Sequence, residues 1–169
     1  MMMDIQFLFF QDDGSIPNNP NLPAAIYKKA LEPDKMEDVF RQHKWSNSWI
    51  NGVLHAHHYH SNTHEVLGIL TGRATLLLGG ADGQVIEVES GDALVLPAGT
   101  GHKCIKAHEN FSVIGAYPNG MDYNMKYGRP DERPEVIDEI KQVPLPETDP
   151  VFGEDGPLLR KWHPPRLNI

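Results

Sequence analysis

The sequence is poor in cysteine, in long apolar runs and in positive charge, and each shortage excludes a class of protein. A single cysteine, Cys104, rules out an internal disulfide and a cysteine-rich zinc module. The longest apolar runs, such as residues 74–78, fall far short of the roughly 18 residues that a membrane-spanning helix needs. We therefore expect neither a disulfide-stabilised domain nor an integral membrane protein.

Positive charge is scarce throughout the chain. There are 15 Lys and Arg against 23 Asp and Glu, which gives a formal net charge of −8 at pH 7. No basic block offsets this excess, so we expect no nucleic-acid partner and no anionic membrane partner. The first ten residues contain no positively charged region and no small-residue cleavage site, which predicts a cytoplasmic protein without a secretory signal.

The length of 169 residues suits one domain, which we place over residues 1–169. Its β-rich core lies at about residues 49–118. An N-terminal arm and helix occupy residues 1–48, and a C-terminal helix and tail occupy residues 119–169. The 15 glycines and 14 prolines are scattered along the chain, which predicts many turns between short elements.

Short β-rich runs alternate with turn signals through the core. The predicted strands are Ile50–Tyr59, Val66–Leu70, Arg73–Leu78, Gln84–Val88, Ala93–Leu96, Lys103–Lys106 and Ser112–Tyr117. Many short strands at this spacing predict an all-β sandwich or barrel. Outside the core we expect a short strand within Asp4–Phe10, a helix of about 10 residues beginning near Asp34, and a helix at Pro134–Val143. The remainder, from Pro144 to Ile169, is predicted to be an extended tail.

Histidine is the residue in surplus: the chain has 9, and five of them lie between His55 and His64. Side chains alternate between the two faces of a strand, so His58 and His60 project from the same side and can reach one metal ion. After a short turn, Glu65 opens the next strand and can return its carboxylate to the same point. His102 follows a Pro/Gly turn that aims it inward. These residues predict a metal site.

The same residues lie at fixed spacings within two motifs. The first motif is a glycine, five residues, His-x-His, three or four residues, Glu, six residues and a glycine, and it is matched by Gly52, His58, His60, Glu65 and Gly72. The second is a glycine, five residues, Pro-x-Gly, two residues and His, and it is matched by Gly91, Pro97, Gly99 and His102. Lys106 stands where the second motif often has Asn. The sequence thus resembles the cupin superfamily, and as a whole it is similar to small single-domain bacterial cupins of the YjlB type.

This resemblance implies a jelly-roll barrel, also called a double-stranded β-helix, with short flanking helices and N- and C-terminal arms. It implies one divalent transition metal ion, Fe, Mn, Ni, Co or Zn, bound by His58, His60, Glu65 and His102. Three neutral imidazoles and one carboxylate leave such an ion with a net charge of +1 and with open coordination positions. The resemblance also implies a possible homodimer, since cupin barrels often pair.

Four further residues are candidates for contact with a substrate. Leu67 and Ile69 share the face of Glu65 and should form an apolar wall. Cys104 and Lys106 share the parity of His102 along the last strands. In a regular strand Lys106 would point into the barrel and could hold a substrate carboxylate, whereas a bulge would release it to solvent. Core packing accounts for Cys104 more simply than reactivity does.

The other histidines have simpler interpretations. By strand parity His55 and His57 fall on the face opposite the metal site, where they would serve packing or an interface. His64 and His108 are expected to face solvent. Gly68, at a position where many cupins have an aromatic residue, projects away from the metal and should affect packing more than chemistry.

The leading hypothesis for function is a mononuclear metal enzyme that acts on a small organic acid or a similar metabolite. Dioxygenase, decarboxylase and isomerase chemistry all remain open, because no second group of residues supplies an obvious general acid or base. Catalytic residues are therefore not assigned. The alternative is a non-catalytic cupin that binds or senses a metal or metabolite. A metal-free epimerase fits less well, because the ligand set is complete.

Overall fold

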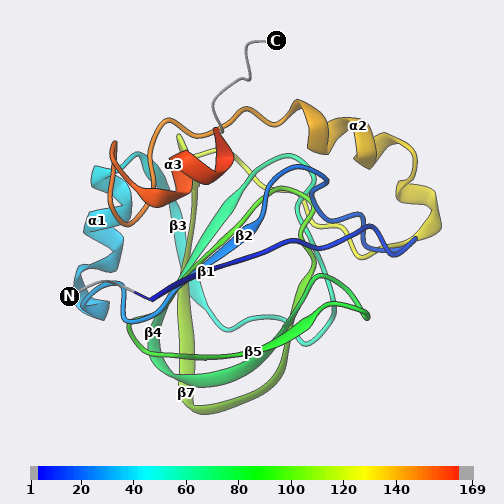
Figure 1. Cartoon of the computed structure of the whole chain (residues 1–169). Coiled ribbons are helices and arrows are strands. Elements are labelled where there is room, and N and C mark those ends of the chain that lie inside the picture. Colours follow the sequence, from blue (N-terminus) through cyan, green and yellow to red (C-terminus); the bar gives the residue numbers. More distant parts are fainter. Residues whose placement is uncertain (1–3, 164–169) are drawn as a thin grey trace.

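The computed structural model describes residues 4–163 (Figure 1). Within these residues the chain forms a seven-stranded antiparallel sheet in the order β1-β2-β6-β4-β7-β3, with β5 paired to β4. The strands are β1 (Ile5–Leu8), β2 (Ala24–Tyr27), β3 (Trp45–Asn51), β4 (Glu65–Leu78), β5 (Gln84–Glu89), β6 (Ala93–Leu96) and β7 (His102–Pro118). The helices are α1 (Met36–Gln42), α2 (Glu135–Gln142) and α3 (Pro157–Trp162), with short 3-10 turns at Pro33–Lys35 and Pro130–Glu132. The predicted all-β architecture with short flanking helices is confirmed.

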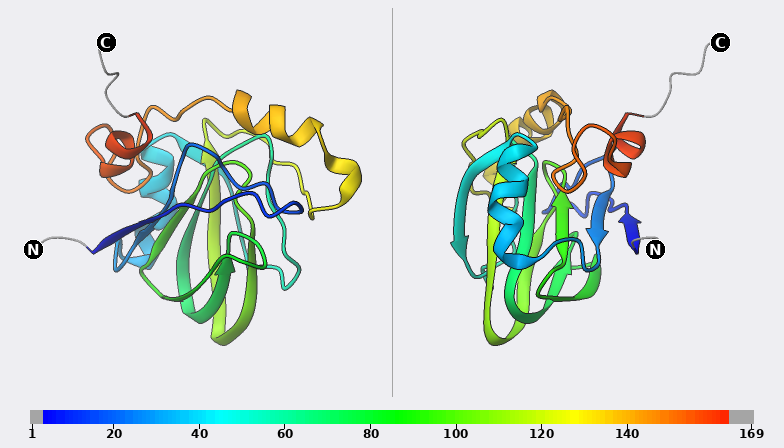
Figure 2. Two further views of the ribbon diagram at one scale, coloured as in Figure 1. Left: turned by 45° about the vertical axis from the view of Figure 1, so that its right-hand side comes forward. Right: turned by 90° about the vertical axis from the view of Figure 1, so that its left-hand side faces the viewer.

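The sheet curves, and the helices of residues 4–163 lie outside it (Figure 2). No helix in this part of the chain has the length and the hydropathy to cross a membrane.

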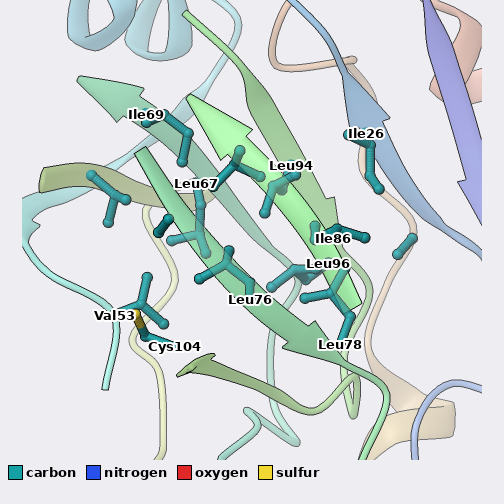
Figure 3. Close-up of a cluster of buried hydrophobic side chains, with 14 residues drawn as sticks. Ile26, Val53, Leu67, Ile69, Leu76, Leu78, Ile86, Leu94, Leu96 and Cys104 are labelled. Atoms are coloured by element: carbon teal, nitrogen blue, oxygen red, sulfur yellow. The ribbon is translucent and has the colours of Figure 1, made fainter. Parts of the chain in front are cut away.

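Each face of the sheet carries its own hydrophobic cluster, because side chains alternate along every strand. In β6, Leu94 and Leu96 belong to the inner cluster, whereas Ala93 and Val95 belong to the outer one. The inner cluster comprises Ala24, Ile26, Val53, Leu67, Ile69, Ala74, Leu76, Leu78, Ile86, Val88, Leu94, Leu96, Cys104 and Val113 (Figure 3). Helices α1 and α3 cover the outer cluster with apolar side chains such as Phe40. Burial on both faces fixes which side chains of β4 and β7 point into the barrel.

Gly68 in β4 lies beneath α1, on the outer face, as strand parity predicts. A Cβ atom at this position would lie 2.6 Å from the sulfur of Met36 and 3.0 Å from the ring of Phe40. The absence of a side chain therefore lets α1 pack directly on the sheet.

The prediction of separate strands in β4 and β7 is wrong. The structure joins Val66–Leu70 with Arg73–Leu78 in β4, and Lys103–Lys106 with Ser112–Tyr117 in β7. Gly72 lies between the two predicted strands and marks a bend within β4, where the register to β7 shifts. Gly72 has a φ of 73°, and a Cβ there would lie 2.4 Å from the carbonyl oxygen of His108. Both facts require glycine at the bend, but neither ends the strand.

The predicted strand Ile50–Tyr59 is also wrong. Strand β3 ends at Asn51, whose side chain accepts a hydrogen bond from the N–H of Gly52 at 2.8 Å. Such a local bond competes with the sheet and lets the chain leave it. His58 returns to the sheet only through an isolated bridge to His102.

The flanking elements are partly as predicted. A strand within Asp4–Phe10 and the two predicted helices are confirmed as β1, α1 with its 3-10 turn, and α2. Strand β2 and helix α3 were not predicted. The tail predicted to be extended from Pro144 to Ile169 contains α3, and residues 164–169 of that prediction lie outside the described residues.

Candidate metal centre

The candidate metal centre lies where β4 and β7 begin. Glu65 is the first residue of β4 and His102 is the first residue of β7. His58 and His102 exchange backbone hydrogen bonds of 3.2 and 2.9 Å. The carbonyl of His60 accepts a bond of 2.7 Å from the N–H of Gly99, in the Pro/Gly turn before β7. Backbone bonds thus bring the two motif segments together.

The structure gathers the ligating atoms of His60, Glu65 and His102 within 4.8 Å of one another. Oε1 of Glu65 lies 3.4 Å from Nε2 of His60 and 3.5 Å from Nε2 of His102. The fourth predicted ligand, His58, is not part of this group of three but lies beside it, with its ring centroid 4.1 Å from that of His102. All four side chains are buried.

Each of the three imidazoles is held in one orientation by a backbone carbonyl. Nδ1 of His58 lies 2.9 Å from the oxygen of Ala56, and Nδ1 of His102 lies 3.0 Å from the oxygen of Thr100. Nδ1 of His60 lies 2.5 Å from the oxygen of Asn124. A carbonyl oxygen only accepts hydrogen bonds, so Nδ1 donates in every case. In the neutral ring, Nε2 then carries a free lone pair, which is the state required of a metal ligand.

The carboxylate of Glu65 is held on one side only. Its Oε2 accepts a hydrogen bond of 2.7 Å from the hydroxyl of Tyr117. The Tyr117 oxygen in turn accepts a bond of 2.6 Å from Nε1 of Trp49. An indole N–H can only donate, so the hydroxyl proton of Tyr117 is left for Glu65. Oε1 of Glu65 is buried and has no hydrogen-bond partner.

This arrangement of acceptors fits a cation. The free lone pairs of His60 and His102 and the unpartnered oxygen of Glu65 face one another in a buried space. Acceptors at such separations repel one another unless a positive charge lies among them, which is either a bound cation or a proton on an imidazole, as the raised pKa of His60 reflects. Nitrogen and carboxylate oxygen without thiolate form a donor set for a divalent transition metal. The residues therefore form a possible His-Glu-His metal site.

The pKa shifts follow from burial and from this clustering. Burial lowers the pKa of His58 to about 3, and the neighbouring His102 adds to the effect. Burial would raise the pKa of Glu65, but His60 and His102 outweigh it and hold that pKa well below its usual range. For His60 burial works to lower the pKa, yet the Glu65 carboxylate raises it. Glu65 is thus ionised and His58 neutral, as metal ligation requires.

A cavity of about 220 Å³ opens beside the possible metal site. The four predicted ligands line it, together with Leu67, Trp49 and Tyr117. Its mouth includes Leu54 and Tyr123, which are 47% and 42% exposed. A small molecule can therefore reach the ligands from solvent.

Of the four residues predicted to contact substrate, Leu67 lines this cavity, and the structure places the other three elsewhere. Ile69 and Cys104 are buried in the inner cluster. Lys106 is exposed, and the reason is a register shift in β7. Cys104 pairs with Leu76, and Lys106, two positions later, pairs with the residue of β4 directly adjacent to Leu76. One residue of β7 between them is therefore extra, and it reverses the face to which the following side chains point.

The prediction that His64 faces solvent is wrong. Its ring is 1% exposed and packs against that of Trp162 at 4.8 Å. Nδ1 accepts a bond from the N–H of Ala98, and Nε2 lies 3.1 Å from the oxygen of Pro144. His57 also serves packing, because its Nε2 accepts from a backbone N–H.

Tyr117, Tyr123 and Asn124 are residues of the site that sequence reasoning missed. Tyr123 stacks on Tyr117, with ring centroids 4.9 Å apart and an interplanar angle of 18°. The side chain of Asn124 bonds both N and Oγ of Ser61, which fixes the carbonyl that holds His60. Parity along β7 could have placed Tyr117 on the inner face, but its partner is 52 positions away in the sequence. No local motif marks Asn124.

Comparison with known proteins identifies a matching family and a similar bacterial protein. The Cupin domain family matches residues 51–114. A protein of Bacillus subtilis (strain 168) described as uncharacterized protein YjlB is 48% identical over 163 residues, which cover 96% of this chain and 99% of that one.

Two solved structures are similar to the chain at low sequence identity. Acireductone dioxygenase from Bacillus anthracis, with a cadmium ion in its active center, is 17% identical with a TM-score of 0.39, over 53% of this chain and 60% of that chain. The WlaRB TDP-quinovose 3,4-ketoisomerase from Campylobacter jejuni is 14% identical with a TM-score of 0.43, over 52% of this chain and 72% of that chain. From its motifs, its jelly-roll sheet and its full-length similarity to YjlB, the chain belongs to the cupin superfamily as a YjlB-like cupin.

Proposed function

We propose that this cupin is a mononuclear metal enzyme that acts on a small organic acid or a similar oxygen-bearing metabolite. His58, His60, Glu65 and His102 would hold one divalent transition metal ion. The observation that carries the proposal is Oε1 of Glu65, which is buried without a partner 3.4 and 3.5 Å from the free Nε2 atoms of His60 and His102. A buried carboxylate oxygen in that position needs a positive partner, and a metal ion supplies one to Glu65 and to both imidazoles at once.

Two properties of the ligand set support this function: its total charge and the number of coordination positions that it leaves open. Three neutral imidazoles and one carboxylate leave a divalent ion with a net charge of +1, and a six-coordinate ion keeps positions for further ligands. When bound, Fe, Mn, Co, Ni or Zn supplies a Lewis acid, and the redox-active members also supply a redox centre. Dioxygenase, decarboxylase and isomerase reactions all use such a centre.

The chain's own residues prepare the site. Tyr117 donates to Oε2 of Glu65 and so directs Oε1 inward. Burial keeps the pKa of Tyr117 far above its ordinary value, with the Glu65 charge adding to the effect, so its hydroxyl stays protonated and continues to donate. Leu67 and Val53 form apolar walls that exclude water and strengthen the electrostatics of the site.

The test begins with metal content. The untagged full-length protein is purified and its bound metal is measured by elemental analysis, with one ion per chain as the expected result. Oxygen consumption and product formation are then followed over a panel of small organic acids. Turnover with at least one acid is expected, and a metal-loaded protein without turnover would favour a non-catalytic cupin that binds or senses a metabolite.

The double variant His60→Ala, His102→Ala is the control for the metal site. It removes two of the gathered ligands and should purify without the ion. A wild-type protein that carries no metal, or a double variant that carries as much as wild type, would refute the proposal. A cytoplasmic location, a homodimer and a single domain over residues 1–169 stay predictions from the sequence.

A further inference from the structure

The cavity beside the possible metal site offers no fixed positive charge. Its lining, drawn entirely from residues 4–163, includes neither Lys nor Arg, and Glu65 is its one carboxylate. Lys106, the cation expected there, is exposed and does not line the cavity. The charge that a ligand meets is thus that of the metal and its ligands.

That charge is enough for one anionic group. A divalent ion with the Glu65 carboxylate and neutral imidazoles has a net charge of +1, so a single ligand carboxylate brings the site to neutrality. A second carboxylate or a phosphate at the other end of the ligand would lie against the apolar walls of the cavity, where it loses water and finds no cationic partner. The cavity therefore disfavours dianions.

The mouth of the cavity carries large apolar surface although it faces solvent. Leu54 and Tyr123 are 47% and 42% exposed, and both line the opening, whereas Ile50 pairs with Ile114 of the outer cluster and so points away from it. Large apolar side chains exposed at a cavity mouth lose contact with water when an apolar ligand covers them. This rim suits the body of a ligand whose polar end lies deeper.

A flat apolar wall lies next to this mouth. Trp49 lines the cavity, and its indole rests on the backbone of Gly115, where a Cβ would lie 2.4 Å from the ring. The indole N–H is already bonded to Tyr117, so the ring presents carbon to the cavity. Gly115 thereby makes room for a wall that contacts apolar or planar groups.

We infer that the cavity binds a small monocarboxylic acid with an apolar body, its acid end toward the metal site and its body against Trp49, Leu54 and Tyr123. This inference rests on the proposed function and narrows its substrate class. The volume of about 220 Å³ lies below the range of about 300–1,000 Å³ that is usual for drug-sized ligands. A branched aliphatic chain or one aromatic ring suits that size, whereas a sugar nucleotide does not, and a dicarboxylate is disfavoured by its second charge.

The test is a matched series of 2-oxo acids, titrated calorimetrically into the full-length protein loaded with Zn(II). The series is pyruvate, 4-methyl-2-oxopentanoate and 2-oxoglutarate, which share one end and differ in having a methyl group, an apolar chain or a second carboxylate. We expect 4-methyl-2-oxopentanoate to bind about tenfold more tightly than either of the others. Equal or tighter binding of 2-oxoglutarate, or no binding of the apolar acid, overturns the inference.

A variant that adds a positive charge tests whether the apolar rim of the cavity causes the preference for the apolar acid. Leu54→Lys puts a cation at the cavity mouth and should reduce the preference for the apolar acid about tenfold by improving 2-oxoglutarate binding. Val85→Lys is the matched control, because Val85 is 55% exposed on β5 and does not line the cavity. A preference that stays at the wild-type value in Leu54→Lys, or that falls as far in Val85→Lys, contradicts the assignment.

The same experiment separates this inference from the proposed function. If the protein binds no Zn(II) by elemental analysis, the metal-enzyme proposal fails and the substrate class fails with it. If Zn(II) binds and 2-oxoglutarate is preferred, the substrate class alone is wrong and the metal site stands.

Discussion

Replacing Tyr117 with Phe removes one oxygen atom and, with it, two hydrogen bonds beside the candidate metal site. The Tyr117 hydroxyl donates to Oε2 of Glu65 at 2.7 Å and accepts from Nε1 of Trp49 at 2.6 Å. In Tyr117→Phe, the carboxylate of Glu65 loses the donor that orients it. Glu65 is only 1% exposed, so water cannot readily replace that donor.

The expected size of the effect follows from the charge on Glu65. A hydrogen bond to a charged group is worth about 1.5–3 kcal/mol. Since about 1.4 kcal/mol corresponds to a factor of ten, the Kd for metal should rise about 10- to 100-fold in Tyr117→Phe. Trp49→Phe removes the donor to Tyr117 but leaves the bond to Glu65 intact, so its effect on metal affinity should be smaller.

A second tyrosine supplies a matched control for general loss of stability. The hydroxyl of Tyr27 donates to Oδ2 of Asp149 at 2.7 Å, and both residues are fully buried away from the cavity. Tyr27→Phe therefore loses the same type of bond to a carboxylate at the same distance. It should lower the free energy of unfolding as Tyr117→Phe does, but it should leave the affinity for metal unchanged.

The assay is competition for Zn(II) against a chromophoric chelator, with urea unfolding of the metal-free variants measured in parallel. Metal affinity in Tyr117→Phe within twofold of wild type would refute the role given to Tyr117. An equal loss of affinity in Tyr27→Phe would show that stability, rather than the orientation of Glu65, decides metal binding.

Three further predictions concern other parts of the chain. Gly68→Val should lower the free energy of unfolding in urea by about 1–3 kcal/mol, because a Cβ there already lies 2.6 Å from Met36 and 3.0 Å from Phe40; unfolding at the wild-type midpoint would contradict it. Asp149→Ala should lower the free energy of unfolding by about 3 kcal/mol or more in the same assay. The reason is that this carboxylate accepts hydrogen bonds from Tyr27 and from the N–H groups of Val151, Phe152 and Leu158. A smaller loss of stability than in Tyr27→Phe would be inconsistent with this prediction. Metal ligation needs a neutral His60, whose pKa the Glu65 carboxylate raises above the ordinary imidazole value of about 6.5, so metal affinity falls as pH drops through that range. Dialysis at about pH 4.5 should therefore remove metal that is kept at about pH 7.5, and metal analysis that finds equal content at both pH values would oppose this.

The candidate site was predictable from the sequence because its residues occupy fixed spacings around turns. His58, His60 and Glu65 lie within eight positions of one another, and His102 follows a Pro/Gly turn that aims it at them. The expected strand through His58 and His60 does not exist, yet both rings reach the cavity. The backbone carbonyls of Ala56 and Asn124 orient the two rings, and such hydrogen bonds form without a regular strand.

The strand boundaries were less predictable, because glycine has the same signature in a turn and in a bulge. Gly72 lies at a shift in the register between β4 and β7, but β4 continues on both sides of it, so two predicted strands are one. The register shift near Ile105 in β7 has the larger consequence, since it turns Lys106 outward and removes the expected substrate cation. A one-residue bulge reverses side-chain parity, and local composition does not reveal where it falls.

The residues that complete the site come from pairings that no local pattern encodes. Trp49 lies in β3, Tyr117 ends β7 and Glu65 begins β4, and only the pairing of β7 between β3 and β4 makes them a chain of hydrogen bonds. The direction of these hydrogen bonds follows from chemistry, because an indole N–H only donates, a hydroxyl accepts one bond and donates another, and a carboxylate only accepts. The chain of hydrogen bonds ends at Oε2 of Glu65, which leaves the other carboxylate oxygen, Oε1, as the buried acceptor without a partner. A motif thus identifies the residues that meet a cation, whereas the topology of the sheet decides how firmly they are held for it.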